Sequence, residues 1–268
     1  MQELYTEGIN DLSKELNEFS NDSKVVIIAA GNGTRLQPLS NNRPKCLINI
    51  LGLSIIERIL NSVKEIGLTN IIIVTGYKRK IIKSEIGDGK KYGVSIQYIY
   101  NSEWEKGNAT SVYSVRNIVG DDFILLMADH LFDSQNLKKV IDFPLIKNTC
   151  LLAIDSNIDH IYDVQEATKV DLDNSIITNI GKELLNYNAI DTGMFRFRRS
   201  IFDALEKSFA ENKYNIQDGI KYLIQNGLMY GTDIGDKFWQ DIDTQVDLQH
   251  VETQLLELQN KAYGSYGL

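Results

Sequence analysis

Short apolar runs recur along the first 155 residues and alternate with segments of helical period. The runs are rich in β-branched residues: KVVIIAA (24–30), NIIIVTGY (70–77), SIQYIY (95–100), DFILLMAD (122–129) and TCLLAID (149–155). Near-continuous apolar strands separated by helices are typical of a parallel sheet that is covered on both faces. The pattern predicts an α/β fold with a Rossmann-like, mixed but mostly parallel central sheet and helices on both faces.

The clearest helix among these segments is SIIERILNSVKEIGL (54–68). Gly67 follows its last apolar position and is a typical stop signal. We expect this helix to be the crossover between the first two strands. Its apolar stripe comprises Ile55, Ile59 or Leu60, Val63 and Ile66.

The pattern changes after residue 155. ATKVDLDNSIITNIGK (167–182) and NAIDTGMFRF (188–197) indicate shorter, partly antiparallel strands, which we interpret as a substrate-side elaboration of the same sheet. Amphipathic helices are expected at both ends and should pack on the core, with a subunit or partner contact as the alternative. We predict a helical extension over 1–22, one main domain over 23–250, and a helix and tail over 251–268. The apolar positions of the terminal helices are Ile9, Leu12, Leu16 and Phe19 within 2–19, and Val246, Leu248, Val251, Leu255 and Leu258 within 244–262.

Composition excludes several classes of protein. The net charge of −8 argues against a broad nucleic-acid-binding face, so any bound phosphate must be met by local basic residues. The two cysteines, Cys46 and Cys150, form no CxxC pair, and four-ligand zinc sites normally draw on more Cys and His than the two and three of this chain. No apolar stretch is long enough to span a bilayer, and the N-terminus lacks a signal-peptide layout. We expect a soluble, cytoplasmic protein.

The loop after the first strand carries the strongest chemical signal. AAGNGTRL (29–36) combines glycines with Arg35, and RPK (43–45) adds Arg43 and Lys45. Glycines let backbone N–H groups approach an anion, and the basic side chains neutralise a polyphosphate. The dinucleotide fingerprint does not fit, because Leu36 stands at the third glycine position, and no Walker motif follows the strand. The loop is therefore expected to bind a nucleotide in another way.

This A-A-G-x-G-T-R-L motif with a following R-P-K resembles that of nucleotidyltransferases, which join a nucleoside triphosphate to a phosphorylated sugar or alcohol. The resemblance implies a glycosyltransferase-A-like fold and a loop that wraps the triphosphate. Arg35 would neutralise the triphosphate, and Lys45 would bridge phosphates of the two substrates. The loop residues that match the motif are Ala29, Ala30, Gly31, Asn32, Gly33 and Thr34.

Carboxylates should face this basic loop, because transfer between two anions needs a cation such as Mg²⁺, which prefers carboxylate oxygens. Asp129 ends a buried strand, at the sheet edge where ligands bind in parallel sheets. Asp241 and Asp243 lie just before the last helix, and their spacing places them on one face of an extended segment. The family likewise has a metal-binding Asp at the position of Asp129 and a second ligand at Asp241 or Asp243. The choice between those two stays open, and Asp243 or Thr244 is also a candidate helix cap.

Further segments extend the resemblance into both substrate sites. EWEKGNATSVYS (103–114) corresponds to the family's base and ribose pocket, where Gly107, Asn108 and Ser111 match, and Gly76 ends the second strand. Residues 164–197 resemble the acceptor-binding half, and His130 lies beside Asp129. The expected acceptor ligands are His130, Glu166, Lys169, Lys182, Asp191, Thr192 and Gly193.

The combination of EKGN, MADH, EATKV, the GK-to-DTG stretch and W-x-D-x-DT is most similar to CTP:inositol-1-phosphate cytidylyltransferases. The resemblance implies transfer of CMP from CTP to inositol 1-phosphate with Mg²⁺, giving CDP-inositol and pyrophosphate. The attacking phosphate is already an anion, so no general base is required. The family is often fused to a membrane-embedded CDP-alcohol transferase. Here that partner would be a separate protein, and a homo-oligomer is possible.

Three other functions remain open at this point. A cytidylyltransferase for phosphocholine or an aminoalkylphosphonate would favour an aromatic cage, to which Tyr187, Phe238 or Trp239 could contribute. A sugar-phosphate thymidylyl- or uridylyltransferase shares the same loop. A catalytically silent nucleotide-binding regulatory module is the non-enzymatic alternative, although Lys45 and the metal carboxylates are present.

Overall fold

The computed structural model describes residues 16–17, 19, 23–36 and 43–264. Four strands form a parallel unit at one end of its largest sheet, in the order β7-β2-β5-β6 with β6 at the edge. Each lies inside a predicted apolar run, so this part of the prediction is confirmed. The bounds are β2 (Lys24–Ala29), β5 (Asn70–Thr75), β6 (Ser95–Tyr100) and β7 (Asp122–Met127).

The second part of the sheet is mixed. The long strand β13 (Ala189–Arg198) runs antiparallel to β7, and its other edge pairs antiparallel with β10 (Cys150–Asp155) and briefly with β11 (Lys169–Asp173). β11 forms a hairpin with β12 (Ile176–Gly181), and β14 (Met229–Asp233) runs parallel to β10. The predicted change to partly antiparallel strands after residue 155 is confirmed.

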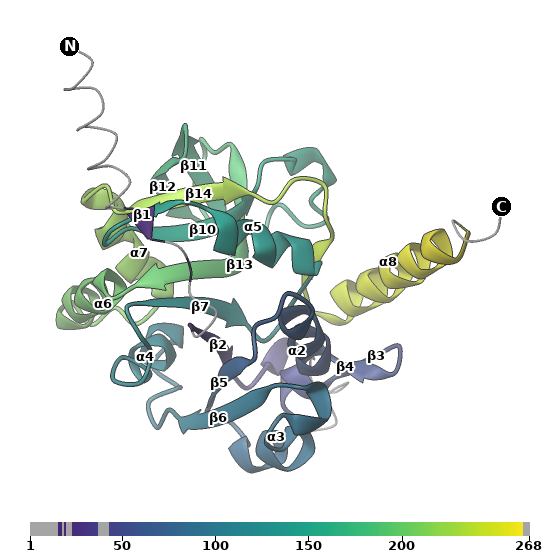
Figure 1. Ribbon diagram of the computed structural model, residues 1–268. Coiled ribbons are helices and arrows are strands. Elements are labelled where there is room, and N and C mark those ends of the chain that lie inside the picture. Colours follow the sequence, from purple (N-terminus) through teal and green to yellow (C-terminus); the bar gives the residue numbers. More distant parts are fainter. Residues whose placement is uncertain (1–15, 18, 20–22, 37–42, 265–268) are drawn as a thin grey trace, which may run out of the picture.

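Helices cover both faces of this sheet, as Figure 1 shows. Alternate residues of β2 point to opposite faces: Val25 and Ile27 join one apolar cluster, and Val26 and Ile28 join the other. The first cluster is completed by α2 (Ile55–Glu65), α3 (Arg79–Ile86) and α5 (Ser134–Asp142). The second is completed by α4 (Asn108–Tyr113), α6 (Ser200–Ala210) and α7 (Ile216–Gln225). The α/β fold with helices on both faces is therefore confirmed.

Helix α2 shows how local sequence sets an element. Ser54 caps its first turn, and the reciprocal bond from the Ser54 backbone N–H to Glu57 completes a capping box. Such a cap contributes about 1 kcal/mol. The predicted stripe is buried from Ile55 to Val63, and Gly67 adopts the positive φ of +84° that ends the helix.

Short elements complete the chain and bring distant segments together. β15 (Trp239–Asp241) pairs antiparallel with β8 (His130–Phe132). The hairpin of β3 (Asn49–Ile50) and β4 (Leu53–Ser54) precedes α2. Among the described residues, 3-10 turns occur at Thr34–Leu36, Lys45–Leu47, Lys90–Tyr92 and Ile158–His160.

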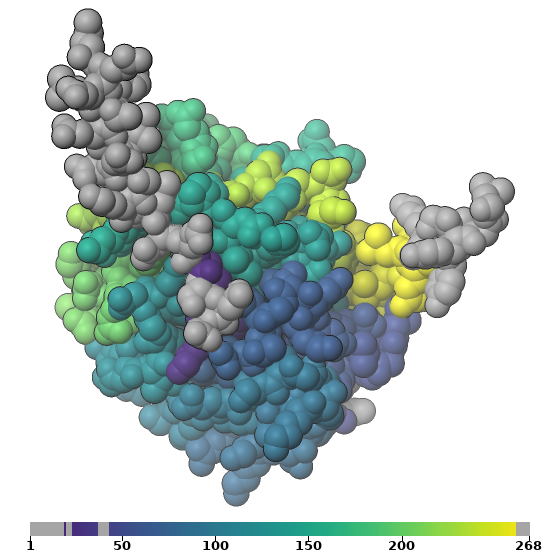
Figure 2. All heavy atoms as spheres, viewed as in Figure 1, coloured from purple at the N-terminus to yellow at the C-terminus, as the bar shows by residue number. Residues whose placement is uncertain are grey.

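The terminal segments differ from expectation. Helix α8 (Gln245–Gly264) has the expected period, but Val251 alone of the predicted stripe is buried, while Val246 and Leu258 are 57% and 44% exposed. The helix extends away from the sheet at the margin of the molecule (Figures 1 and 2), so its outer part has no core to pack against within the described residues. None of the helices in the described ranges is long and apolar enough to cross a membrane.

Most of the predicted helix over 2–19 lies outside the described residues, as does the predicted extension over 1–22. Leu16 and Asn17 form the short strand β1 (Leu16–Asn17), which pairs with β9 (Leu145–Ile146), so a helix through these two positions is wrong. Pairing with an available strand overrides the local helical period.

Candidate functional site

The glycine-rich loop follows the carboxyl end of β2 and borders a cavity of about 240 Å³. Gly33 has a positive φ of +58°, and a Cβ there would lie 2.7 Å from the Lys45 Cβ. Only glycine lets the loop pass this close to Lys45. The predicted residues that line this nucleotide-loop cavity are Ala29, Gly31, Asn32, Gly33, Thr34, Arg35, Lys45, Asp129 and Asp243.

Lys45 lies between two carboxylates that come from distant parts of the chain. Its Nζ is 2.7 Å from Asp129 Oδ2 and 2.5 Å from Asp243 Oδ1. Arg35 approaches the other oxygen of Asp243 at 2.6 Å. Burial lowers the pKa of Lys45, but the two carboxylates outweigh it, and the net pKa is raised. Burial by itself would raise the pKa of Asp129, yet Lys45 and His130 hold it well below its usual range. Lys45 and Asp129 are therefore both charged at neutral pH.

Backbone pairing explains why these groups meet. The Ala128 N–H donates to Ile28 O, which places Asp129 at the carboxyl end of the sheet. The Ile242 N–H donates to Asp129 O at 3.0 Å, in register with the β8–β15 pair. That bond brings Asp243 to the edge where Asp129 and Lys45 already lie.

Asp241 and Asp243 differ in their surroundings. The Asp243 side chain contacts Lys45 and Arg35, and Asp247 Oδ2 accepts the backbone N–H groups of Asp243 and Thr244 at the start of α8. Asp241 lies in β15 and accepts from Gln240 Nε2. Burial raises the pKa of Asp241. The geometry thus places Asp243 beside Asp129, and Asp241 lines only the neighbouring cavity.

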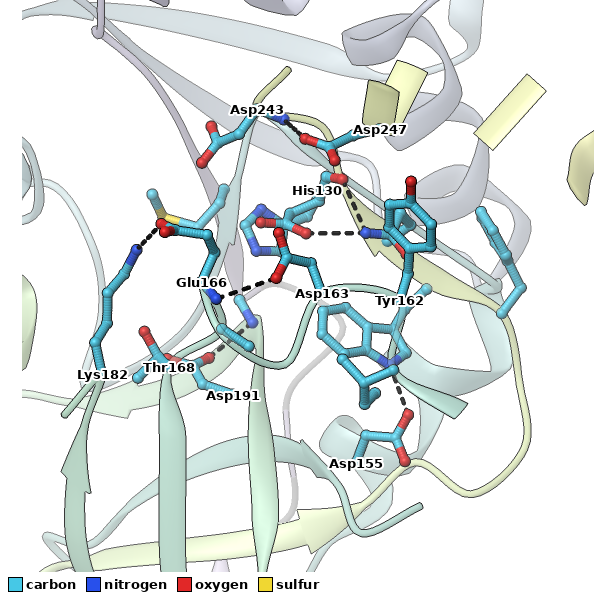
Figure 3. Close-up of a pocket in the computed structure, with 18 of the residues that line it drawn as sticks. His130, Asp155, Tyr162, Asp163, Glu166, Thr168, Lys182, Asp191, Asp243 and Asp247 are labelled. Carbon is cyan, nitrogen blue, oxygen red and sulfur yellow. Dashed lines mark hydrogen bonds and ion pairs between the residues drawn. The ribbon is translucent and has the colours of Figure 1, made fainter. Parts of the chain in front are cut away.

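A second cavity, of about 770 Å³, opens on the other side of Arg35 and Asp243, which line both. Figure 3 shows it, with side chains converging from β8, β13 and the segment after β10. We call it the acceptor cavity. The predicted residues that line it are Asn108, His130, Glu166, Lys182, Asp191, Gly193 and Asp241, in addition to the two shared with the first cavity.

Close packing fixes the centre of the acceptor cavity. His130 Nδ1 lies 2.7 Å from Asp129 Oδ1, and a Cβ on Gly193, whose φ is +73°, would lie 2.4 Å from the His130 ring. Asp191 accepts the Gly193 N–H, and burial raises the pKa of Asp191 to about 6. Lys182 lies at the rim, 3.4 Å from Glu166. The polar groups are therefore preorganised around a space for a small molecule.

Several predicted ligands line neither cavity. Lys169 is buried, and its Nζ donates to the carbonyls of Gln165 and Lys182. Thr192 Oγ1 donates to Ala153 O. Gly76 is in a tight contact, since a Cβ there would lie 2.4 Å from Trp104 and 2.7 Å from Ala30 O. The remaining three are Ser111, which accepts from Asn101, Gly107, which packs on Tyr214 O, and Ala30, whose carbonyl accepts the Tyr77 N–H.

The acceptor cavity also contains residues that the sequence did not single out as ligands. Asp155 is the last residue of β10, a position similar to that of Asp129 just after β7. The Asp155 carboxylate accepts the Trp239 indole N–H at 2.7 Å. The same rule of strand ends that located Asp129 applies to Asp155. Tyr162, from the segment after β10, stacks on His250 of α8, with ring centroids 3.9 Å apart. Gln217, whose amide donates to Thr168, has no comparable signal in the sequence.

Comparison with known proteins agrees with this geometry. A model of the nucleotidyl transferase family matches residues 24–257. The chain is 30% identical over 241 residues to a bifunctional IPC transferase and DIPP synthase of Aquifex aeolicus, covering 89% of this chain and 53% of that protein. It is 29% identical over 222 residues to the bifunctional protein GlmU of Methanococcus maripaludis, covering 81% and 50%. The chain thus spans about half the length of these relatives.

The fold also matches solved structures. The inositol-1-phosphate CTP transferase of T. maritima superposes with a TM-score of 0.76 at 24% identity, covering 85% of this chain and 92% of that one. A putative glucose-1-phosphate thymidylyltransferase of Bacillus anthracis has a TM-score of 0.74 at 21% identity, covering 86% and 94%. At these identities the likeness shows the shared fold.

Proposed function

Because the chain belongs to the nucleotidyl transferase family, we propose that it transfers CMP from CTP to inositol 1-phosphate, releasing pyrophosphate and CDP-inositol. The observation that carries the proposal is the junction of the two cavities at Arg35 and Asp243, with Lys45 beside it. A nucleotide on the loop and a phosphorylated acceptor in the larger cavity would meet at this cluster. The printed names of the first relatives and of the T. maritima structure support the choice of substrates.

The described side chains suit charge stabilisation. Lys45 and Arg35 would neutralise the phosphates that come together, and Lys182 would meet the acceptor's phosphate from the rim. Preorganised cations at developing negative charge contribute most of the catalysis in this kind of reaction. The attacking phosphate oxygen is already ionised, so His130 is not required as a general base.

A divalent cation, which we propose to be Mg²⁺, would be held by Asp129 and Asp243. Their hard oxygen atoms fit such an ion, and both already face one cationic group, the Lys45 ammonium. Within the described residues no cluster of three or more His, Cys, Asp or Glu side chains suits a metal, so nucleotide phosphates would complete the ligand set. When bound, the ion would offset the repulsion between the two anionic substrates.

A cytoplasmic location, a homo-oligomer and a separate membrane-embedded CDP-alcohol transferase that consumes the product remain predictions.

The phosphocholine alternative loses part of its support. Of the three aromatic residues considered for a cage, Phe238 and Trp239 line the acceptor cavity, but Tyr187 does not. The Tyr187 ring instead lies 5.9 Å from the buried Lys169 ammonium.

The test is pyrophosphate release with Mg²⁺ from each of CTP, UTP, dTTP, ATP and GTP against inositol 1-phosphate, phosphocholine and glucose 1-phosphate. We expect release only with CTP and inositol 1-phosphate, and loss of release in Lys45→Ala and Asp129→Asn. Release with another pair would retain the nucleotidyl transfer and replace the substrates. No release with any pair would favour the regulatory module.

A further inference from the structure

Trp239 is held in one orientation at the wall of the acceptor cavity. Its indole N–H donates to Asp155 Oδ2 at 2.7 Å, and Asp155 is only 7% exposed. The second oxygen of Asp155 accepts the Asn157 N–H at 2.8 Å, which fixes the carboxylate. The His130 ring lies nearly parallel to the indole, with centroids 6.5 Å apart and an interplanar angle of 14°. Burying a carboxylate costs desolvation free energy, which the two hydrogen bonds to Asp155 offset. We take the use of a buried carboxylate at this position as a sign that the orientation of the indole matters.

The wall around Trp239 suits the neutral, hydroxylated ring of a ligand. An indole face is a flat apolar surface, which the C–H face of a ring can cover. Carboxylates accept hydrogen bonds from hydroxyl groups, and carboxamides both accept and donate them. The polar lining of the cavity offers both kinds of group, from Asn157, Glu166, Asp191, Gln217, Gln240 and Asp241.

A cage for a quaternary ammonium is less well supported. Such a cage needs aromatic faces on several sides of the cation. The Tyr162 ring is already stacked on His250, so one of its faces is covered.

We propose that Asp155 is a positioning residue that orients Trp239 as the platform for the ring of a cyclic polyol phosphate, and that this pair selects the acceptor class. The inference rests on the proposed function, since it assigns the acceptor cavity to the phosphorylated acceptor. It adds that recognition of the ring, and not of the phosphate alone, depends on the orientation of one indole.

The first test separates acceptor binding from nucleotide binding in steady-state assays with inositol 1-phosphate. Trp239→Ala and Asp155→Ala should raise the acceptor KM about tenfold, a loss of about 1.4 kcal/mol, with the KM for CTP unchanged. Asp155→Asn retains an oxygen that can accept the indole N–H but loses the acceptor for the Asn157 N–H, so it should raise the acceptor KM less than Asp155→Ala does. Asp233→Ala is the matched control, because Asp233 ends the neighbouring strand β14, accepts the Gly235 N–H and does not line the cavity. An unchanged acceptor KM in Trp239→Ala, or equal effects in Asp155→Asn and Asp155→Ala, would overturn the proposal.

The second test needs no turnover and uses the fact that the chain has two tryptophans. Trp104 packs on Gly76 near the nucleotide loop, so Trp104→Phe leaves Trp239 as the single tryptophan, whose emission is excited selectively over that of the tyrosines. Inositol 1-phosphate and glucose 1-phosphate should change its emission with saturation, whereas inorganic phosphate and phosphocholine should not. A change in emission with phosphocholine or with inorganic phosphate alone would overturn the proposal that Trp239 is the platform for the ring. A response to glucose 1-phosphate without turnover of inositol 1-phosphate would support the platform while refuting the proposed substrate.

Discussion

The glycine-rich loop and the acceptor cavity are built in opposite ways. The loop side draws most of its groups from one continuous stretch, residues 28–46, and adds Ala128, Asp129 and Asp243. The acceptor cavity draws on strand ends and connections from Arg35 to Gln254, with no motif that supplies most of it. A site made by one loop can be recognised in the sequence because its groups lie at fixed separations along the chain. A site made by strand ends cannot be recognised in this way, because its groups come close together only in the folded sheet.

The two regions differ in chemistry as well. On the loop side, Arg35 and Lys45 are paired with carboxylates at 2.5 to 2.7 Å, and these contacts suit the charge of any nucleoside triphosphate. The acceptor side combines two lysines, Lys182 and Lys237, with carboxylates, carboxamides and an oriented indole. Catalytic power should therefore depend on the first region and acceptor choice on the second, and four predictions test this division.

Lys45 should have the largest effect. Lys45→Ala removes the cation between Asp129 and Asp243, and we expect kcat to fall about 10³-fold, as for loss of a preorganised charge at the reacting phosphates. Lys45→Arg keeps the charge in a different shape and should lose less. Pyrophosphate release measures both variants. If Lys45→Ala kept more than a tenth of wild-type kcat, the loop side would not be the source of catalysis.

The two late aspartates should differ. Asp243→Asn removes a carboxylate charge beside Lys45 and Asp129, and we expect kcat to fall about 10²-fold, with a higher Mg²⁺ concentration needed for half-maximal rate. Asp241→Asn is the matched control and should cost less than about tenfold, because Asp241 lines only the acceptor cavity. Mg²⁺ titrations of both variants measure the difference. Equal Mg²⁺ dependence in the two would contradict the assignment of Asp243.

The two lysines predicted to bind the acceptor should have different roles: Lys182 should bind the acceptor, and Lys169 should stabilise the fold. Lys182→Ala should raise the acceptor KM about tenfold with the KM for CTP unchanged, since one charged contact to phosphate is lost. Lys169→Met should instead lower the free energy of unfolding by about 1–3 kcal/mol, because two carbonyls lose their buried donor. Kinetics and urea unfolding on both variants test this. A normal stability of Lys169→Met with a raised acceptor KM would return Lys169 to the site.

Asp191 should have the smallest effect, on stability. Its pKa is raised to about 6 in the folded state, so the folded protein binds the proton more tightly than the unfolded chain, and this contribution is lost as the pH rises through 6. Asp191→Asn keeps an acceptor for the Gly193 N–H. It should match the wild type near pH 4 and exceed it by about 1 kcal/mol at pH 8, after allowance for partial exposure. Urea unfolding at the two pH values measures the difference. A variant less stable than the wild type at pH 8 would show that the charged form is favoured in the fold.

Sequence patterns predicted the parallel strands, the crossover helix α2 and the placement of the loop with Lys45 and Asp129 at one edge of the sheet. These features depend on interactions close in sequence: alternation along β2, the capping box at Ser54 and the glycines before Arg35.

The packing of α8 was predicted wrongly at Val246 and Leu258, because periodicity shows which positions form a stripe but not whether another surface meets it. Lys169 was predicted to bind the acceptor for a similar reason. Its charge can be recognised in the sequence, but its burial against two backbone carbonyls cannot.

The amino-acid order alone was sufficient to indicate a nucleotide-binding loop and an acidic partner for it, since those groups follow directly from the end of an apolar strand. The choice of Asp243 over Asp241 beside Lys45 came from the fold, through the pairing of β15 with β8 and the backbone bond from Ile242 to Asp129. Asp155 and Trp239 are 84 residues apart, and they meet because the end of β10 and the start of β15 lie at the same cavity. Local order sets which groups a segment offers, whereas long-range strand pairing sets which of them meet, because contacts across a sheet have no fixed separation along the chain.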